Sequence, residues 1–273
     1  MRPLYKSAGF SLIEMILVIA ITGIVGSMVA VFLRVPIESY IAQDRHARLT
    51  DTADTALRRM GRDIRLALPN SVRVDSVGGV SYLEFLGTRD GGRYRTQGDG
   101  SVGNDPLDFT STSGDSSFDV LGPPIAMQAG DLIAVYNLGI GGADAWAGDT
   151  LSAYTGGAAA VNNIAITPKA SMQFPLASPG NRFQVVEGPV TYACDPVAGT
   201  LTRFWGYAIA ASQPMPPVAP MSSALLANRV SACNFSYQPG VTERGGLVSM
   251  TLSISQEDET VRLYSNMQVG NQP

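Results

Sequence analysis

Charged side chains are scarce in this chain of 273 residues. They make up 15% of the sequence, whereas a typical soluble protein has about 25%. The mean hydropathy is +0.10, and 45% of the residues are hydrophobic. This composition excludes a chain that is disordered through excess charge. The length is enough for one large domain or two small ones with a substantial core.

Histidine is nearly absent, because His46 is the single example. One histidine leaves little room for a Ser-His-Asp triad or for a metal site built from several imidazoles. No serine or cysteine nucleophile can be paired with His46 by spacing, so we expect an exposed polar residue there. The sequence therefore predicts a protein that is not an enzyme, with no catalytic residues, no metal and no cofactor.

An excess of positive charge is also missing, since the net charge is −4 and the pI is near 5.0. The balance varies along the chain: residues 34–65 hold seven basic and five acidic residues, and residues 66–273 hold 10 basic and 17 acidic. Proteins that bind nucleic acid normally present a basic face. We therefore expect no nucleic-acid partner.

Cysteine occurs only twice, as Cys194 and Cys233. The even count suits one disulfide, although two separate buried thiols would also fit. Disulfides persist in oxidising compartments, so a disulfide here would place the C-terminal part of the chain outside the cytoplasm. This inference matters because basic residues flank the apolar N-terminal run on both sides, and charge alone does not decide its orientation.

A long apolar run lies near the N-terminus. Residues 15–33, MILVIAITGIVGSMVAVFL, contain no charge, and the run extends back to Phe10 with Glu14 as its one charged member. A helix over residues 10–34, at about 1.5 Å per residue, is long enough to cross a hydrocarbon core of about 30 Å. A buried core helix would carry a polar face, and a secretory signal has a shorter run followed by a small-residue cleavage site. We expect these residues to span a lipid bilayer once.

The helical pattern continues over residues 35–69, where apolar residues recur at spacings that place them on one stripe. Pro69 ends the pattern, because proline disfavours helix at the preceding residue. An amphipathic helix needs a surface to cover its stripe, and we expect the chain's own globular part to supply it. The stripe consists of Ile37, Ile41, Leu49, Ala53, Leu57, Met60, Ile64 and Leu68.

Residues 70–273 change to a strand pattern, with short β-branched and aromatic runs separated by Gly, Pro, Asn and Asp. We expect an α+β protein in which an antiparallel sheet packs against the amphipathic helix, since each buries the apolar side of the other. The last two runs flank QEDE and predict a hairpin. The expected strands are 71–74, 80–86, 131–136, 182–186, 190–194, 200–207, 230–237, 247–255 and 260–269.

Two glycine-rich segments, 87–117 and 139–157, are expected to be loops. The first contains four aspartates whose spacing does not match a calcium-binding EF-hand loop. We therefore expect solvated carboxylates rather than a metal site. These aspartates are Asp99, Asp105, Asp108 and Asp115.

The N-terminal sequence KSAGFSLIEMILVIAITGIVG resembles the N-terminus of type IV prepilins. A short basic leader, a glycine, an aromatic residue, an acidic residue and an apolar run follow one another in the order found in that family. The resemblance implies that residues 1–9 are a leader peptide, that prepilin peptidase cuts between Gly9 and Phe10, and that Phe10 is then N-methylated. It also implies that mature subunits pack their apolar helices into a filament.

The same resemblance gives Glu14 a role in assembly. A carboxylate in an apolar helix bundle is costly unless it is paired, and cleavage would free a cationic amine at Phe10 in the same apolar layer. In the family, the glutamate is thought to neutralise that amine. The alternative is a carboxylate that reaches the membrane interface from near the start of the run.

Segments further along resemble a minor pilin of the MSHA pilus biogenesis system, of the MshO type, and the first part also resembles the J-class minor pseudopilins of type II secretion. This resemblance implies a type IV pilin-like fold, in which a long N-terminal helix packs on a β-rich head over residues 70–273. The segments are RLTDTADTALRRMGRDIRLALPNSVRV, YLEFLGTRDGGRYR, GDLIAVYNLGI, GPVTYACD, LTRFWGY and CNFSYQPG.

The implied function is that of a minor pilin in the initiation or tip of an MSHA-like pilus. The implied partners are prepilin peptidase, other minor and major pilin subunits, the inner-membrane assembly platform and the lipid bilayer. The precursor would cross the inner membrane once with its head in the periplasm and then enter the filament. A J-class pseudopilin and a filament-tip adhesin are the alternatives.

Overall fold

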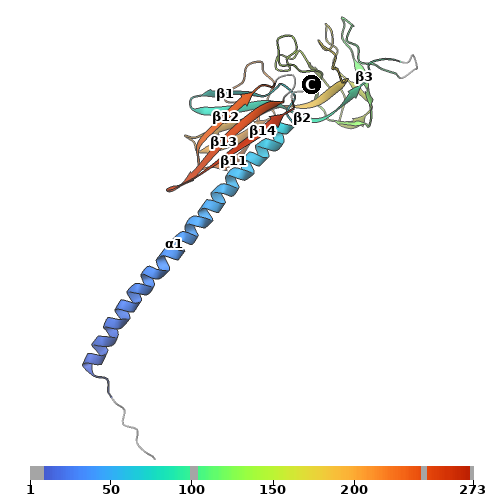
Figure 1. Ribbon diagram of the computed structural model, residues 1–273. Coiled ribbons are helices and arrows are strands. Elements are labelled where there is room, and N and C mark those ends of the chain that lie inside the picture. The colour runs from blue at the N-terminus through green and yellow to red at the C-terminus, as the bar shows by residue number, and fades with distance from the viewer. Residues whose placement is uncertain (1–8, 99–103, 241–244, 271–273) are drawn as a thin grey trace, which may run out of the picture. The chain divides into compact units, whose positions relative to one another are not determined.

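The computed structural model describes residues 9–98, 104–240 and 245–270. The chain divides into two units, Met1–Arg48 and Leu49–Pro273. One long helix, α1 (Leu12–Arg65), is the regular structure of the described part of the first unit and the opening element of the second (Figure 1). The α+β expectation is confirmed, because this helix is followed by antiparallel sheets.

In the first unit, α1 presents its apolar side chains to the surroundings. Ile37 and Ile41 are 57% and 52% exposed, so the predicted buried stripe does not include them. Ion pairs four residues apart support the helix on its polar positions, with Arg34 Nε 2.7 Å from Glu38 Oε1. Such exposed pairs contribute only about 0.3–0.5 kcal/mol each.

In the second unit, the stripe is buried as predicted from its third member onward. Leu49, Ala53, Leu57, Met60 and Ile64 are all less than 5% exposed. They contact residues from both large sheets and form one core with them. The stripe therefore becomes buried where sheet residues cover it, which begins at Leu49.

The end of α1 lies earlier than predicted. The helix stops at Arg65, whereas the sequence pattern extends it to Leu68. Ala67 instead forms a bridge with Gly87, and the Leu68 amide donates a hydrogen bond to the Leu86 carbonyl at 2.7 Å. These residues have left the helix because strand β2 satisfies their backbone groups.

The strands form one nine-stranded sheet, one three-stranded sheet and one pair, and all the strand pairs described are antiparallel. The large sheet runs β11-β10-β9-β2-β3-β8, with β1 paired to β2, β5 paired to β9, and β6 paired to β5. Its strands are β1 (Arg73–Val77), β2 (Val80–Tyr94), β3 (Ser117–Leu121), β5 (Leu132–Ala134), β6 (Leu151–Ala153), β8 (Asn163–Ala165), β9 (Arg182–Asp195), β10 (Thr200–Trp205) and β11 (Ser222–Asn228). The others are β12 (Val230–Gln238), β13 (Gly246–Gln256) and β14 (Glu259–Val269), and the pair β4 (Ile125–Met127) and β7 (Ala159–Val161).

The predicted C-terminal hairpin is confirmed as β13 and β14, which pair from Gln256↔Glu259 outward. The expected loop 139–157 contains strand β6. Two further expectations were wrong. The segment 87–117 is not a loop throughout, since β2 continues through it to Tyr94, and the two strands expected at 182–186 and 190–194 are the single strand β9. Strands β2 and β9 pair with each other through these segments. Gly87 lies opposite Gly188, and the register of the pair is irregular immediately after Gly87.

The core of the second unit joins α1 to both large sheets. The disulfide Cys194–Cys233 connects β9 to β12. The side chain of Met267 from β14 covers α1 at Gly61, where its methyl carbon would lie 2.5 Å from an added Cβ atom. A second core, rich in aromatic residues and containing Phe118 and Phe183, lies among the strands and loops of residues 94–185.

Candidate processing and assembly site

Three residues precede the helix and form the start of the described chain. Gly9, Phe10 and Ser11 have no regular secondary structure, and the Phe10 side chain is 81% exposed. A bond in non-helical, exposed backbone is accessible to a peptidase. The rest of the predicted leader, residues 1–8, lies outside the described residues.

Ser11 caps the helix. Its hydroxyl oxygen accepts a hydrogen bond from the Glu14 amide at 3.3 Å, and its carbonyl accepts the first helical bond, from the Met15 amide, at 3.2 Å. Serine is a favoured N-cap residue because it satisfies an amide that has no partner within the helix. The cap is an addition to the predicted site residues, and its sequence signal is S-L-I-E at 11–14, which matches the pattern S-x-x-E of a capping box.

Glu14 lies in the first turn of α1, and its side chain is exposed. A carboxylate is favoured there by about 0.3–1 kcal/mol, because the amide groups of the first turn carry partial positive charge. Glu14 is the one charged residue of the chain between Phe10 and Leu33. In the uncleaved chain, residue 10 has no free amine.

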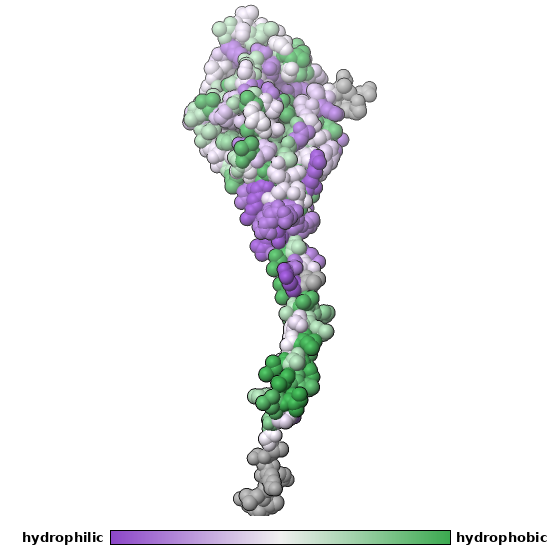
Figure 2. Space-filling view, turned by 90° about the vertical axis from the view of Figure 1, so that its left-hand side faces the viewer, coloured by the Kyte–Doolittle hydropathy of each residue, from purple (hydrophilic) through white to green (hydrophobic). Residues whose placement is uncertain are grey.

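The helix surface next to Glu14 is apolar. By length and composition, α1 suffices to cross a membrane, and its most apolar stretch of 18 residues is not buried within the structure. Figure 2 shows this part of α1 in green. Side chains of this kind need lipid or another apolar helix around them.

The predicted loop aspartates act as hydrogen-bond acceptors that organise the second unit. Asp105 Oδ2 accepts from Ser117 Oγ at 2.6 Å and from Asn163 Nδ2 at 3.0 Å. Asn163 also reaches Asp119 Oδ1 at 3.0 Å. Among the described residues, no three His, Cys, Asp or Glu side chains are placed to hold a metal ion. Asp99 lies outside the described residues.

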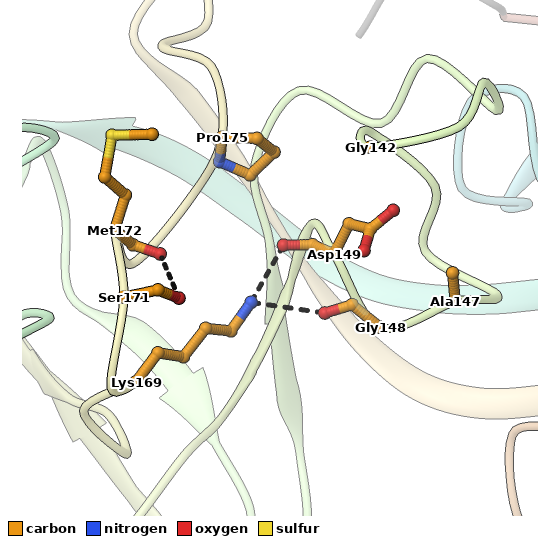
Figure 3. A pocket seen from close by; sticks show the side chains of 8 residues that line it. All are labelled: Gly142, Ala147, Gly148, Asp149, Lys169, Ser171, Met172 and Pro175. Atoms are coloured by element: carbon orange, nitrogen blue, oxygen red, sulfur yellow. Dashed lines mark hydrogen bonds between the residues drawn. The ribbon is translucent and has the colours of Figure 1, made fainter. Parts of the chain in front are cut away.

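A hollow of about 370 Å³ lies over the loops around Lys169 and Asp149 (Figure 3). Lys169 Nζ donates hydrogen bonds to the carbonyl oxygens of Gly148 and Asp149, at 3.2 and 2.8 Å. Burial lowers the pKa of Lys169, and the Asp149 carboxylate opposes that effect. The lysine thus joins two loops, and the residues lining the hollow offer no nucleophile paired with a base.

The residues singled out from the sequence differ in burial and in the element that carries them. His46 is exposed on α1. Cys194 is fully buried, and its bond to Cys233 joins two sheets within the second unit. Gly9, Phe10 and Glu14 adjoin the Ser11 cap and form one segment at the start of α1.

Comparison with known proteins agrees with this segment. A family model described as the prokaryotic N-terminal methylation motif matches residues 4–30. No curated protein and no solved structure matches the chain. The motif supports a type IV pilin-like subunit, and the long apolar helix followed by antiparallel sheets is consistent with the α+β pilin-like fold. The motif implies processing by prepilin peptidase, membrane anchoring and assembly with other pilins, as suits a structural subunit.

Proposed function

We propose that this chain is a minor pilin that acts in the initiation or at the tip of an MSHA-like type IV pilus. Prepilin peptidase removes residues 1–9 by cutting between Gly9 and Phe10, and the new amine of Phe10 is methylated. Residues 10–34 anchor the precursor in the inner membrane, and residues 35–69 continue the helix into a periplasmic head, residues 70–273. The methylation motif over residues 4–30 is the observation that carries this proposal.

Three features support it. The helix starts at Leu12, directly after the proposed cut, so Gly9 and Phe10 are non-helical and exposed. Glu14 is the single carboxylate near the amine that cleavage would create. The second unit is large for a subunit that repeats along a filament, which favours a role in small copy number at the tip.

Substitution of Gly9 tests the processing step. We expect Gly9→Val to leave the chain at precursor size on a gel in cells that contain the peptidase. Gly141→Val is the matched control, because at Gly141, as at Gly9, an added Cβ atom would have no neighbour within 4 Å, and we expect it to be cleaved normally. Normal cleavage of Gly9→Val would contradict the proposed site.

Substitution of Glu14 tests the assembly step in the same cells. Removing one partner of a buried charge pair costs about 3–5 kcal/mol, so Glu14→Ala should stay in the membrane and be depleted in sheared filaments by more than about tenfold. Glu38→Ala is the control, since Glu38 is exposed and pairs with Arg34 on the same helix. Equal recovery of Glu14→Ala and wild type would contradict the role. Loss of protein secretion with intact surface fibres would indicate a pseudopilin instead.

A further inference from the structure

Two arginines lie directly opposite each other where β2 and β9 pair. Arg93 of β2 is the register partner of Arg182 of β9, and both are exposed. Side chains that are directly opposite in an antiparallel pair point to the same face of the sheet, with their Cβ atoms about 4.5–5.5 Å apart. Like charges in this position are destabilising, so the two arginines lower the stability of the fold unless an anion lies between them.

The protein itself does not supply that anion. Among the ion pairs of the described residues, none includes Arg93 or Arg182. By contrast, Arg89 in β2 and Arg95 just after β2 each pair with a carboxylate. Carboxylates are in excess in this part of the chain, since residues 66–273 hold 10 basic and 17 acidic residues. The two facing arginines are therefore left unpaired in acidic surroundings.

Both arginines line a hollow of about 390 Å³ on the surface of the sheet. Gly91 lies two residues before Arg93 on the same strand, so its missing side chain leaves room beside Arg93 on that face. Leu121 of β3 lies opposite Arg93 on the other side, lines the hollow and is 43% exposed. None of the described lining residues is acidic. A hollow of this volume suits a small molecule.

The hollow also has an acceptor that lacks a donor. Gln184 lines it and lies opposite Gly91 in the register. The Gln184 Oε1 atom is buried and accepts no hydrogen bond from the residues that the structure describes. Buried polar atoms are normally hydrogen-bonded, and one without a partner needs an explanation. A hydroxyl group of a bound molecule would supply the missing donor.

The chemistry of the two arginines favours a phosphate group. A planar guanidinium offers parallel N–H donors to phosphate or carboxylate oxygens. A phosphate monoester carries about −1.5 to −2 charges at neutral pH and balances two guanidinium groups, whereas a carboxylate or a sulfate ester carries one negative charge. The acidic excess of residues 66–273 would repel a long polyanion.

We propose that the hollow between Arg93 and Arg182 binds a small soluble molecule that carries a phosphate monoester. The two guanidinium groups hold the phosphate, Leu121 contacts the carbon skeleton, and a hydroxyl group of the ligand donates to Gln184 Oε1. This binding activity goes beyond the proposed role in a filament and does not depend on it.

Isothermal titration calorimetry on the full-length chain in detergent and phosphate-free buffer tests the choice of ligand. Glucose 6-phosphate is the probe, and glucose 6-sulfate is the matched ligand with the same sugar and one negative charge. We expect the phosphate ester to bind at least about tenfold more tightly than the sulfate ester. Equal affinities, or no binding of glucose 6-phosphate at millimolar concentration, would overturn the proposal.

Matched substitutions of arginine test the site. Arg182→Gln should weaken the binding of glucose 6-phosphate by about tenfold or more. Arg262→Gln is the control, because Arg262 is exposed on β14 and does not line the hollow, and it should bind as the wild type does. Equal affinities of the wild type and Arg182→Gln, or equal weakening in both variants, would contradict a site at this hollow.

Thermal unfolding without ligand separates a binding role of Arg182 from a structural one. Because Arg182→Gln removes one of two facing like charges, we expect its thermal midpoint to equal or exceed that of the wild type. A midpoint lower by several degrees would show that Arg182 stabilises the fold through contacts of its own and would overturn the proposal. These measurements require no filament, so a negative result leaves the proposed function standing.

Discussion

Asp119 shows how single carboxylates organise the glycine-rich part of the second unit. Its Oδ2 atom accepts the Asp105 amide at 3.0 Å and lies 3.3 Å from Arg95 Nε, and Asn163 donates to its Oδ1. The Asp105 amide, the Asn163 side chain and the Arg95 charge together hold the pKa of Asp119 below its usual value, against the opposing effect of burial. Each of these donors favours the ionised form.

This shift predicts a pH dependence of stability. A carboxyl whose pKa is lower in the folded state stabilises the fold above its unfolded pKa of about 3.9, and the contribution is lost as the pH falls through the folded value. We expect the thermal midpoint of the wild type to fall as the pH drops below about 4. Asp119→Asn should be less stable at neutral pH and should lose less stability on acidification.

Thermal unfolding of the purified chain in detergent, followed at a series of pH values, measures both effects. Asp75→Asn is a suitable control, because Asp75 lies at an exposed position of strand β1 and its carboxylate accepts the amide of the adjacent Ser76. Parallel pH profiles for Asp119→Asn and the wild type would contradict the predicted coupling.

Individual side-chain contacts were the features least predictable from the sequence. The N-cap at Ser11 could have been found, because its partner is three residues away. Arg73 could not, because its guanidinium stacks 3.6 Å from the Trp146 ring centroid and donates to Glu84 and to the Ala210 and Ala211 carbonyls. Such partners come from separate elements, and no local spacing indicates them.

At the scale of elements, the connection between α1 and the large sheet depends on Asp63. Its Oδ2 atom accepts hydrogen bonds from Tyr192 Oη and Arg203 Nε, both at 2.8 Å, and its Oδ1 lies 3.2 Å from Arg59 Nε. A carboxylate near the C-terminus of a helix is disfavoured by about 0.3–1 kcal/mol. Hydrogen bonds to charged groups contribute about 1.5–3 kcal/mol, so the contacts with the sheet outweigh that cost.

Asp63→Asn should therefore lower the free energy of unfolding by about 2 kcal/mol. The amide would leave Arg203 and Tyr192 with one weaker acceptor between them. Asp54→Asn is the control on the same helix, because Asp54 pairs with the exposed Arg58, and it should cost at most about 0.5 kcal/mol. Denaturant unfolding in detergent compares the two, and equal effects would contradict the role of Asp63.

Elements were predictable where local pattern and tertiary environment agree. The stripe from Leu49 to Ile64 and the alternation in 247–255 indicate a buried helix face and a half-buried strand, and both are observed. Strand β11 was missed, because SSALLAN has no β-branched or aromatic residue, and pairing with β10 creates it. The continuation of β2 through Gly91 and Gly92 likewise depends on its pairing with β9.

At the scale of the whole molecule, the two units differ in chemistry. The first exposes the apolar side chains of α1, and the second buries its apolar residues and carries the acidic excess. The apolar run and the charge-free stretch 204–228 both contribute to the low charged fraction of the sequence. The exposed apolar run suits contact with lipid or with the apolar helices of other subunits.

The most direct test of this account is the intact mass and N-terminal sequence of the chain isolated from cells with a prepilin peptidase. We predict a mature chain that begins at Phe10 and is heavier than the unmodified polypeptide by one methyl group on its amine. A chain that still begins at Met1, that begins at any residue other than Phe10, or that lacks the methyl group would contradict the proposal that Gly9, Phe10 and Glu14 form the processing and assembly site.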